Sequence, residues 1–98
     1  MSAIRSLDDS TASLRLLIAL YQIDEPIMLS NLYQTMHEKY GLGRRAVDSA
    51  IQTCIQLKLV KRETKRIGKN PMPSIFHELT SKGKKIAELC IQIEKLLR

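Results

Sequence analysis

The sequence contains few of the residues that build metal or redox sites. It has two cysteines, Cys54 and Cys90, which are too few and too far apart to form a disulfide framework. Its two histidines, His37 and His77, are not spaced as metal ligands relative to each other or to the cysteines, whereas a zinc site needs close ligand pairs. We therefore expect no metal and no cofactor.

Catalytic patterns are absent as well. No Ser-His-Asp or Cys-His arrangement is supported by its surroundings, and the four glycines do not form a phosphate-binding loop. Adjacent carboxylates occur at Asp8-Asp9 and Asp24-Glu25, where helix capping and helix termination explain them. The sequence therefore predicts a protein that is not an enzyme.

Long hydrophobic segments are also missing. The longest apolar run extends from Leu16 to Tyr21, far short of the roughly 18 residues that a membrane-spanning helix needs. Residues 1–10 lack the pattern of a signal peptide, so we expect a cytoplasmic protein with no membrane partner. The 98 residues, 44% of them apolar and 27% charged, predict one globular domain over 1–98.

Positive charge is concentrated in one part of the chain. The whole sequence has a formal net charge of +6. Residues 1–40 carry more acidic than basic groups, whereas residues 41–85 hold most of the lysines and arginines and few acids. A solvated helix face normally mixes both signs, so this one-sided block favours a polyanionic partner, nucleic acid first and an acidic protein or membrane surface second.

Apolar periodicity and turn residues predict an α+β fold that is mostly helical. The predicted elements are a helix from Asp8-Asp9-Ser10, a short extended piece at Ile27-Met28, helices over 29–40 and 44–57, strands over 59–66 and 74–79 around a Pro- and Gly-containing loop, and a helix from a Thr80 cap to Leu97. The three-residue turn between the helices at 29–40 and 44–57 contains glycine, which is typical of a helix-turn-helix.

Each predicted helix has an apolar stripe that we expect to be buried. The stripes are Leu14, Leu17, Ile18 and Tyr21 in the first helix; Leu29, Leu32, Tyr33, Met36 and Tyr40 in the second; and Val47, Ala50, Ile51 and Cys54 in the third. The opposite face of the third helix holds Arg45, Asp48, Ser49, Gln52 and Gln56, with no long apolar residue.

Three stretches of the chain carry a family resemblance. They are Leu29 to Val47, the segment from Ile51-Gln52-Thr53-Cys54 through Leu59-Val60-Lys61-Arg62, and Leu79-Thr80-Ser81-Lys82-Gly83-Lys84-Lys85-Ile86, of which the last is the most specific. Together they resemble the winged helix-turn-helix domain of MarR-like and PadR-like transcription regulators. The resemblance implies a three-helix core and a β-hairpin wing within 1–85, followed by a C-terminal dimerisation helix over 81–98.

The sequence departs from this family pattern at four positions. Cys54 stands where leucine is usual, Lys58 where glycine is usual, Met28 where a capping Ser or Thr is common, and His77 where the PadR-like group often has an aromatic residue. The chain also lacks the extra helices of a long MarR-type dimer interface. It therefore resembles a minimal version of the fold.

The third helix, 44–57, is the expected recognition helix because one helix fits the major groove of B-DNA. Arg45 can donate two hydrogen bonds to guanine and Gln52 can pair with adenine, while Arg44 and Ser49 can reach phosphates; Asp48 lies on the same face. The alternative is an ordinary solvated helix face without a partner.

The hairpin over 61–75 is the expected DNA-contacting wing. Its candidate contacts are Arg62, Lys65, Arg66 and Lys69, on the phosphate backbone or in the minor groove. Strand alternation places Lys61 and Lys65 on one face and Arg62 and Arg66 on the other. The alternative is that the lysines only protect an exposed strand edge from pairing.

The last helix carries more apolar surface than one core stripe needs. Ile86, Cys90, Ile93 and Leu97 repeat at coiled-coil spacing and are the expected homodimer interface, with Leu89 and Leu96 toward the domain's own core. Leu7 and Leu14 can join the interface. Cys90 then becomes a buried thiol or an inter-chain disulfide, and the alternative is that all of these residues pack within one monomer.

The sequence thus predicts a dimeric, sequence-specific, double-stranded-DNA-binding transcription regulator. Two alternatives stay open: a non-specific DNA-organising protein of chromatin type, and a winged-helix module that binds other proteins. A regulator discriminates its site from random DNA by about 10³ or more, whereas a chromatin-type protein does not. No residue pattern points to a particular small-molecule effector.

Overall fold

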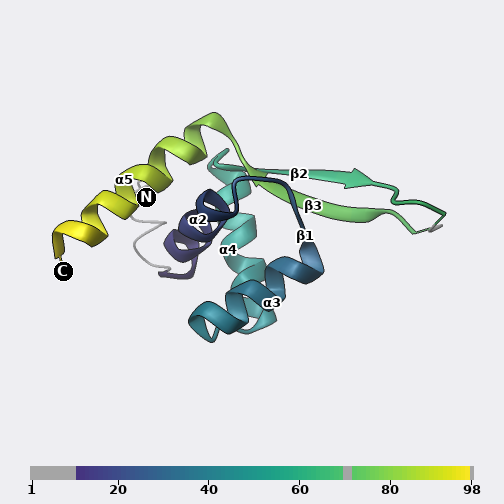
Figure 1. Cartoon of the computed structure of the whole chain (residues 1–98), viewed down its shortest axis with the longest axis horizontal. Coiled ribbons are helices and arrows are strands. Elements are labelled where there is room, and N and C mark those ends of the chain that lie inside the picture. The colour runs from purple at the N-terminus through teal and green to yellow at the C-terminus, as the bar shows by residue number, and fades with distance from the viewer. Residues whose placement is uncertain (1–10, 70–71, 98) are drawn as a thin grey trace.

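The computed structural model describes residues 11–69 and 72–97 (Figure 1). The predicted helix start at Asp8-Asp9-Ser10, and Leu7, lie outside these residues. The elements are α2 (Thr11–Ile23), β1 (Ile27–Met28), α3 (Leu29–Tyr40), α4 (Arg44–Gln56), β2 (Val60–Lys65), β3 (Ser74–Leu79) and α5 (Ser81–Leu97). Among the described helices, none is both long enough and apolar enough to cross a membrane.

The strands form an antiparallel sheet in the order β1-β3-β2. β2 and β3 pair along their full length, from Val60 opposite Leu79 to Lys65 opposite Ser74, and β1 adds to the other edge of β3. The β2–β3 hairpin projects far beyond the helices, as a wing (Figure 1). With α3 and α4 joined by a short turn, these elements form a winged helix, as the sequence predicts.

The turn between α3 and α4 begins at Gly41. This residue has φ +67°, in the left-handed region where glycine is not penalised, and its N–H donates to the carbonyl oxygen of His37 at 2.8 Å. The turn ends α3 at Tyr40 and changes the direction of the chain, so that α4 begins at Arg44 with a new orientation. The glycine in the predicted helix-turn-helix is therefore the residue that its geometry requires.

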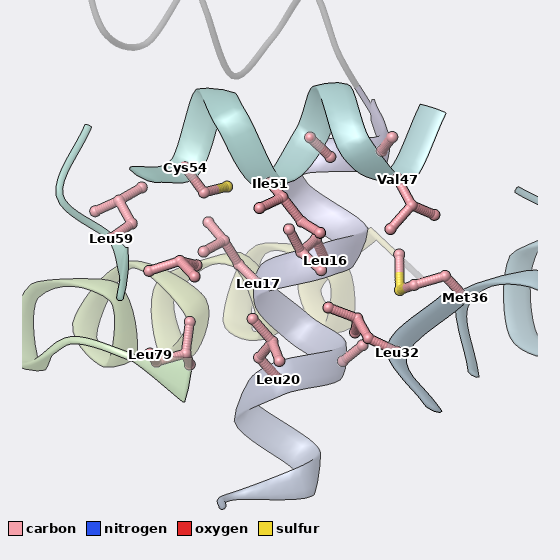
Figure 2. Packing of buried hydrophobic residues seen from close by; sticks show 14 of the residues in the cluster. Leu16, Leu17, Leu20, Leu32, Met36, Val47, Ile51, Cys54, Leu59 and Leu79 are labelled. Atoms are coloured by element: carbon pink, nitrogen blue, oxygen red, sulfur yellow. The ribbon is translucent and has the colours of Figure 1, made fainter. Parts of the chain in front are cut away.

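The core is centred on α2 (Figure 2). Leu16 and Leu17 of this helix lie among side chains from α3, α4 and the strands. The labelled contributors from the other elements are Leu32, Met36, Val47, Ile51, Cys54, Leu59 and Leu79. The predicted buried stripe of α4, Val47, Ala50, Ile51 and Cys54, is confirmed in full.

The predicted stripe of the first helix is wrong in part. Leu17 is buried, but Leu16 and Leu20 are buried as well, whereas Leu14, Ile18 and Tyr21 remain partly exposed. The reason is that α2 is contacted by α3, α4, α5 and β3. A helix enclosed by several neighbours buries more of its circumference than a single amphipathic stripe.

The predicted division of the last helix is also wrong. Leu89 and Leu96, expected to face the domain's own core, are 55% and 85% exposed. Gly83 and Ala87 are instead the buried residues of α5, and Ile86 packs partly against the core. Only the first turns of α5 lie over the core, and the rest of the helix extends past it (Figure 1).

Candidate nucleic-acid interface

The exposed face of α4 is the face that the sequence analysis assigns to DNA. Arg45, Ser49 and Gln52 are all exposed, on the side opposite the buried Val47 and Ile51. Because the buried residues anchor α4 to α2 and α3, this polar face has a fixed orientation. It presents a guanidinium, a hydroxyl and an amide, which are groups that can read base edges or phosphates.

Two other candidate residues of this helix contact a tyrosine of α3. The guanidinium carbon of Arg44 lies 4.8 Å from the centre of the Tyr33 ring, in a cation–π contact. The Tyr33 hydroxyl donates a hydrogen bond to Oδ1 of Asp48. Partial burial raises the pKa of Tyr33, and the hydrogen bond to Asp48 acts in the same direction. Tyr33 therefore holds the first turns of α4 against α3.

This role of Tyr33 is absent from the sequence interpretation, which assigns the residue to an apolar stripe. Tyr33 and Asp48 are 15 positions apart and lie on different helices. The residue type does indicate that Tyr33 makes a hydrogen bond, since the hydroxyl of a half-buried tyrosine usually has a partner. The pattern alone does not identify which partner that is.

The wing brings together the strongest positive charge. Lys61, Arg62, Lys65, Arg66 and Lys69 are all exposed. Two of them have acidic partners on one face of the hairpin: Lys61 lies 3.2 Å from Glu78, and Lys65 lies 3.5 Å from Glu63. Exposed pairs of this kind are weak, about 0–1 kcal/mol, so both lysines remain available to another anion.

Arg62 makes a different contact, on the other face of the hairpin. Its Nε donates a hydrogen bond to Nε2 of His77, its direct partner on β3, at 3.1 Å. His77 is 1% exposed. Burial lowers the pKa of His77 to about 4, and the charge of Arg62 acts in the same direction, while Asp48 opposes them. The imidazole is therefore neutral at pH 7.

The base of the wing lies near α4, since residues of α4 contact β2. Arg62 is two residues beyond Val60, which is buried in the core, so it lies at this base. Lys69 lies in the turn at the far end of the hairpin.

A second surface lies between α2 and α5, away from the wing (Figure 1). Leu14 and Ile18 from α2 face Cys90, Ile93 and Leu97 from α5 across a groove of about 500 Å³. Arg15 and Glu94 carry the charges at this groove. Three of the four predicted dimer-interface residues therefore line one groove, and the fourth, Ile86, packs partly on the domain's own core.

The two cysteines have different environments. Cys54 is fully buried, and its thiol donates to the carbonyl oxygen of Ser13 at 3.9 Å. Burial raises the pKa of Cys54 to about 12, so the unreactive thiol predominates. This is the core role that the sequence predicts. Cys90 is partly exposed in the α2–α5 groove.

No cluster of three or more metal-ligating side chains occurs within the described residues. The surfaces of α4 and of the wing present exposed basic and polar groups.

No protein-family model matches the chain, and no curated protein matches it. Among solved structures, the circadian clock associated protein Pex from Anabaena superposes with a TM-score of 0.62 at 13% identity, over 87% of this chain and 81% of that one. Pex from Synechococcus sp. (strain PCC 7942) gives 0.63 at 15% identity, over 89% and 82%. SSV1 F-93 gives 0.60 at 20% identity, over 88% and 92%. These likenesses establish a shared fold.

Proposed function

We propose that the protein is a dimeric, sequence-specific, DNA-binding transcription regulator. The observation that carries the proposal is the combination of two neighbouring elements. One is α4, which presents Arg45, Ser49 and Gln52 on a rigidly held polar face. The other is the wing, which adds five exposed basic side chains. A helix and a basic projection of this kind match a major groove flanked by phosphates.

In this proposal the side chains of α4 have different tasks. Arg45 and Gln52 enter the groove and read guanine and adenine edges, because long exposed side chains on the outer face reach farthest. Ser49 and Arg44 contact phosphates. Asp48 supports the helix through Tyr33 and is close to the DNA without being its main reader. Sequence discrimination then resides chiefly in Arg45 and Gln52.

The wing supplies affinity in the proposal. Lys65, Arg66 and Lys69 follow the backbone or the minor groove, and Arg62 contacts a phosphate near the base of the wing. Each phosphate contact releases condensed counterions, so the affinity falls with salt at a log–log slope of about −0.9 per contact. Most of the affinity gained from these phosphate contacts is independent of DNA sequence.

Dimerisation is proposed through the α2–α5 groove and the apolar residues beyond it. Leu89, Ile93, Leu96 and Leu97 are all more than half exposed. This amount of exposed apolar side chain on one helix favours an interface. A second copy is the chosen occupant because the groove carries one basic and one acidic residue, Arg15 and Glu94, beside its apolar side chains, which is a composition that can pair with itself about a two-fold axis. Two recognition helices then face half-sites about one helical turn apart.

The proposal is tested by selecting bound sequences from a random DNA pool and then measuring affinity as a function of salt. We expect a palindromic site bound at least about 10³-fold more tightly than random DNA. Tight binding without sequence preference would favour the DNA-organising alternative. An absence of binding at about 50 mM salt would reject nucleic acid as the partner and favour the protein-interaction alternative.

A further inference from the structure

A buried histidine and an exposed arginine are joined within the wing. Nε of Arg62 donates to Nε2 of His77 at 3.1 Å, and the two residues are direct partners across β2 and β3. Their side chains therefore lie on the same face of the hairpin. The opposite face carries the neighbouring cross-strand pair of Lys61 and Glu78.

The protonation of His77 follows from this contact. Because Nε2 accepts the hydrogen bond from Arg62, the imidazole proton is on Nδ1. Nδ1 is buried and has no hydrogen-bond partner among the described residues. An apolar side chain would fill this position without leaving a buried polar atom unpartnered. Packing alone therefore does not account for a histidine here, whereas the acceptor for Arg62 does.

The contact also fixes how Arg62 is presented. It uses Nε, the nitrogen nearest the side-chain stem, and leaves the two terminal amino groups of the guanidinium for another partner. These terminal groups form the fork that binds a phosphate through two hydrogen bonds. A lysine has no Nε and no planar fork, so a single ammonium would have to serve both His77 and the anion and could not bind a phosphate through two parallel hydrogen bonds.

The location ties this pair to the recognition helix. Val60, two residues before Arg62, is buried in the core, so β2 is anchored at this point. The carboxylate of Asp48 on α4 acts electrostatically on His77. Arg62 is thus held at the corner between α4 and the wing, where the DNA backbone flanking the major groove would pass.

We propose that His77 is a positioning residue, which holds the guanidinium of Arg62 toward a DNA phosphate at the corner between α4 and the wing. The inference rests on the proposed DNA binding. It separates Arg62 from the other basic residues of the wing. Lys61 and Lys65 form weak ion pairs with Glu78 and Glu63, and Lys65 also lies over the Phe76 ring at 5.7 Å. Arg62 differs because a buried side chain orients its guanidinium before DNA arrives. A group oriented beforehand loses less conformational freedom on binding.

The test is the salt dependence of DNA affinity for variants of the full chain. Arg62→Ala should lower the log–log slope by about 0.9, the value for one phosphate. His77→Phe keeps the charge of Arg62, so it should keep most of the slope but weaken binding at every salt concentration, because an unheld guanidinium loses more conformational freedom on binding. The double variant should bind no more weakly than Arg62→Ala, because His77 acts through Arg62. His77→Gln, whose side-chain oxygen can accept from Nε, should keep most of the affinity. Lys82→Ala, which removes an exposed positive charge of α5, is the control and should keep the wild-type affinity and slope.

Arg62→Lys provides a second arm that leaves His77 intact. It keeps the positive charge but removes Nε, so we expect the slope to be kept and the affinity to fall about as far as in His77→Phe. Wild-type affinity in Arg62→Lys, or in a folded His77→Phe variant, would overturn the positioning role while leaving DNA binding in place. A wild-type chain that binds no DNA would instead remove the proposed function on which the inference depends.

Discussion

Gly83 of α5 packs directly on the backbone of Leu59, in the turn that leads into β2. A Cβ atom at Gly83 would overlap the Leu59 carbonyl oxygen and lie 2.9 Å from its carbonyl carbon. Thr80 fastens the same junction, since its Oγ1 donates to the carbonyl oxygen of Lys58 at 2.7 Å and accepts from the N–H of Gly83 at 3.0 Å. Thr80 and Gly83 of the segment Leu79-Thr80-Ser81-Lys82-Gly83 therefore hold the start of α5 against the turn that precedes β2.

Gly83→Ala should destabilise the protein by about 1–3 kcal/mol, the usual cost of inserting a methyl group into a filled site. The direction is informative, because alanine is the better helix former by about 1 kcal/mol and an open helical site would gain stability. Chemical denaturation measures the effect. Lys82→Ala, on the exposed side of the same turn, is the control and should change stability by less than about 0.5 kcal/mol. If Gly83→Ala and Lys82→Ala are equally stable, the close packing of Gly83 on Leu59 does not contribute to stability.

Lys58 occupies a backbone conformation that favours glycine. Its φ is +62°, and its N–H donates to the carbonyl oxygen of Ile55 at 2.9 Å, just after the end of α4. Lys58→Gly should therefore raise the free energy of unfolding by about 1 kcal/mol, by relieving this strain. Lys58→Ala also removes the charged side chain but keeps the Cβ, and should give little change. If both variants behave alike, the strain is not the cause.

Local features of the fold can be predicted from the sequence. The order of the elements, the glycine turn and the buried stripe of α4 follow from periods and turn residues that act locally. Lys58 stands where the resemblance leads us to expect glycine, but its positive φ is visible only in the structure. The resemblance indicates that position 58 is unusual, and the left-handed backbone conformation of Lys58 explains why glycine is expected there.

The errors arise where burial depends on distant elements. The predicted stripe of α2 is wrong in part because α3, α4, α5 and β3 together cover more of this helix than its own period indicates. The prediction that Leu89 faces the core is wrong because a helix period does not reveal where the core ends along α5. The contacts of Tyr33 with Asp48 and of Arg62 with His77 join different elements, so a single sequence names the residues but not the pairs.

The stability of the protein should depend on pH through His77. Burial lowers its pKa to about 4 in the folded state, from 6.5 in an exposed histidine. The unfolded chain therefore binds more protons between these values, and stability should fall by up to about 3 kcal/mol as the pH decreases from 6.5 to 4. Denaturation across this range should show a weaker fall in His77→Gln. If the stability of the wild-type chain and that of His77→Gln fall equally with pH, another group is responsible.

The recognition helix and the wing should contribute differently to DNA binding. Gln52→Ala should reduce discrimination between the selected site and a site altered at one base pair by about 1–3 kcal/mol, with little change on random DNA. Arg45→Ala should act in the same way. Lys69→Ala should weaken both kinds of DNA about equally and lower the salt slope by about one. Identical behaviour of Arg45→Ala and Lys69→Ala would mean that α4 does not read bases.

The assembly is tested at Ile93, which lines the α2–α5 groove and is 57% exposed in the single chain. Ile93→Glu should cost a monomer little, because the carboxylate remains in water, but it should break a dimer that buries this residue. By sedimentation, we expect the intact chain near twice 11.2 kDa at micromolar concentration and the variant near 11.2 kDa with its helical signal retained.

The matched control is Gln92→Glu, which adds the same charge to an exposed residue about 100° around α5 from Ile93 and outside the residues that line the groove. It should remain dimeric. If Ile93→Glu dissociates and Gln92→Glu does not, charge repulsion in general is excluded and the groove is the interface. DNA affinity should then fall in Ile93→Glu alone, because a monomer offers one recognition helix to one half-site. A monomeric intact chain, or an Ile93→Glu variant that stays dimeric, would place the interface elsewhere and remove the reason to expect a palindromic target.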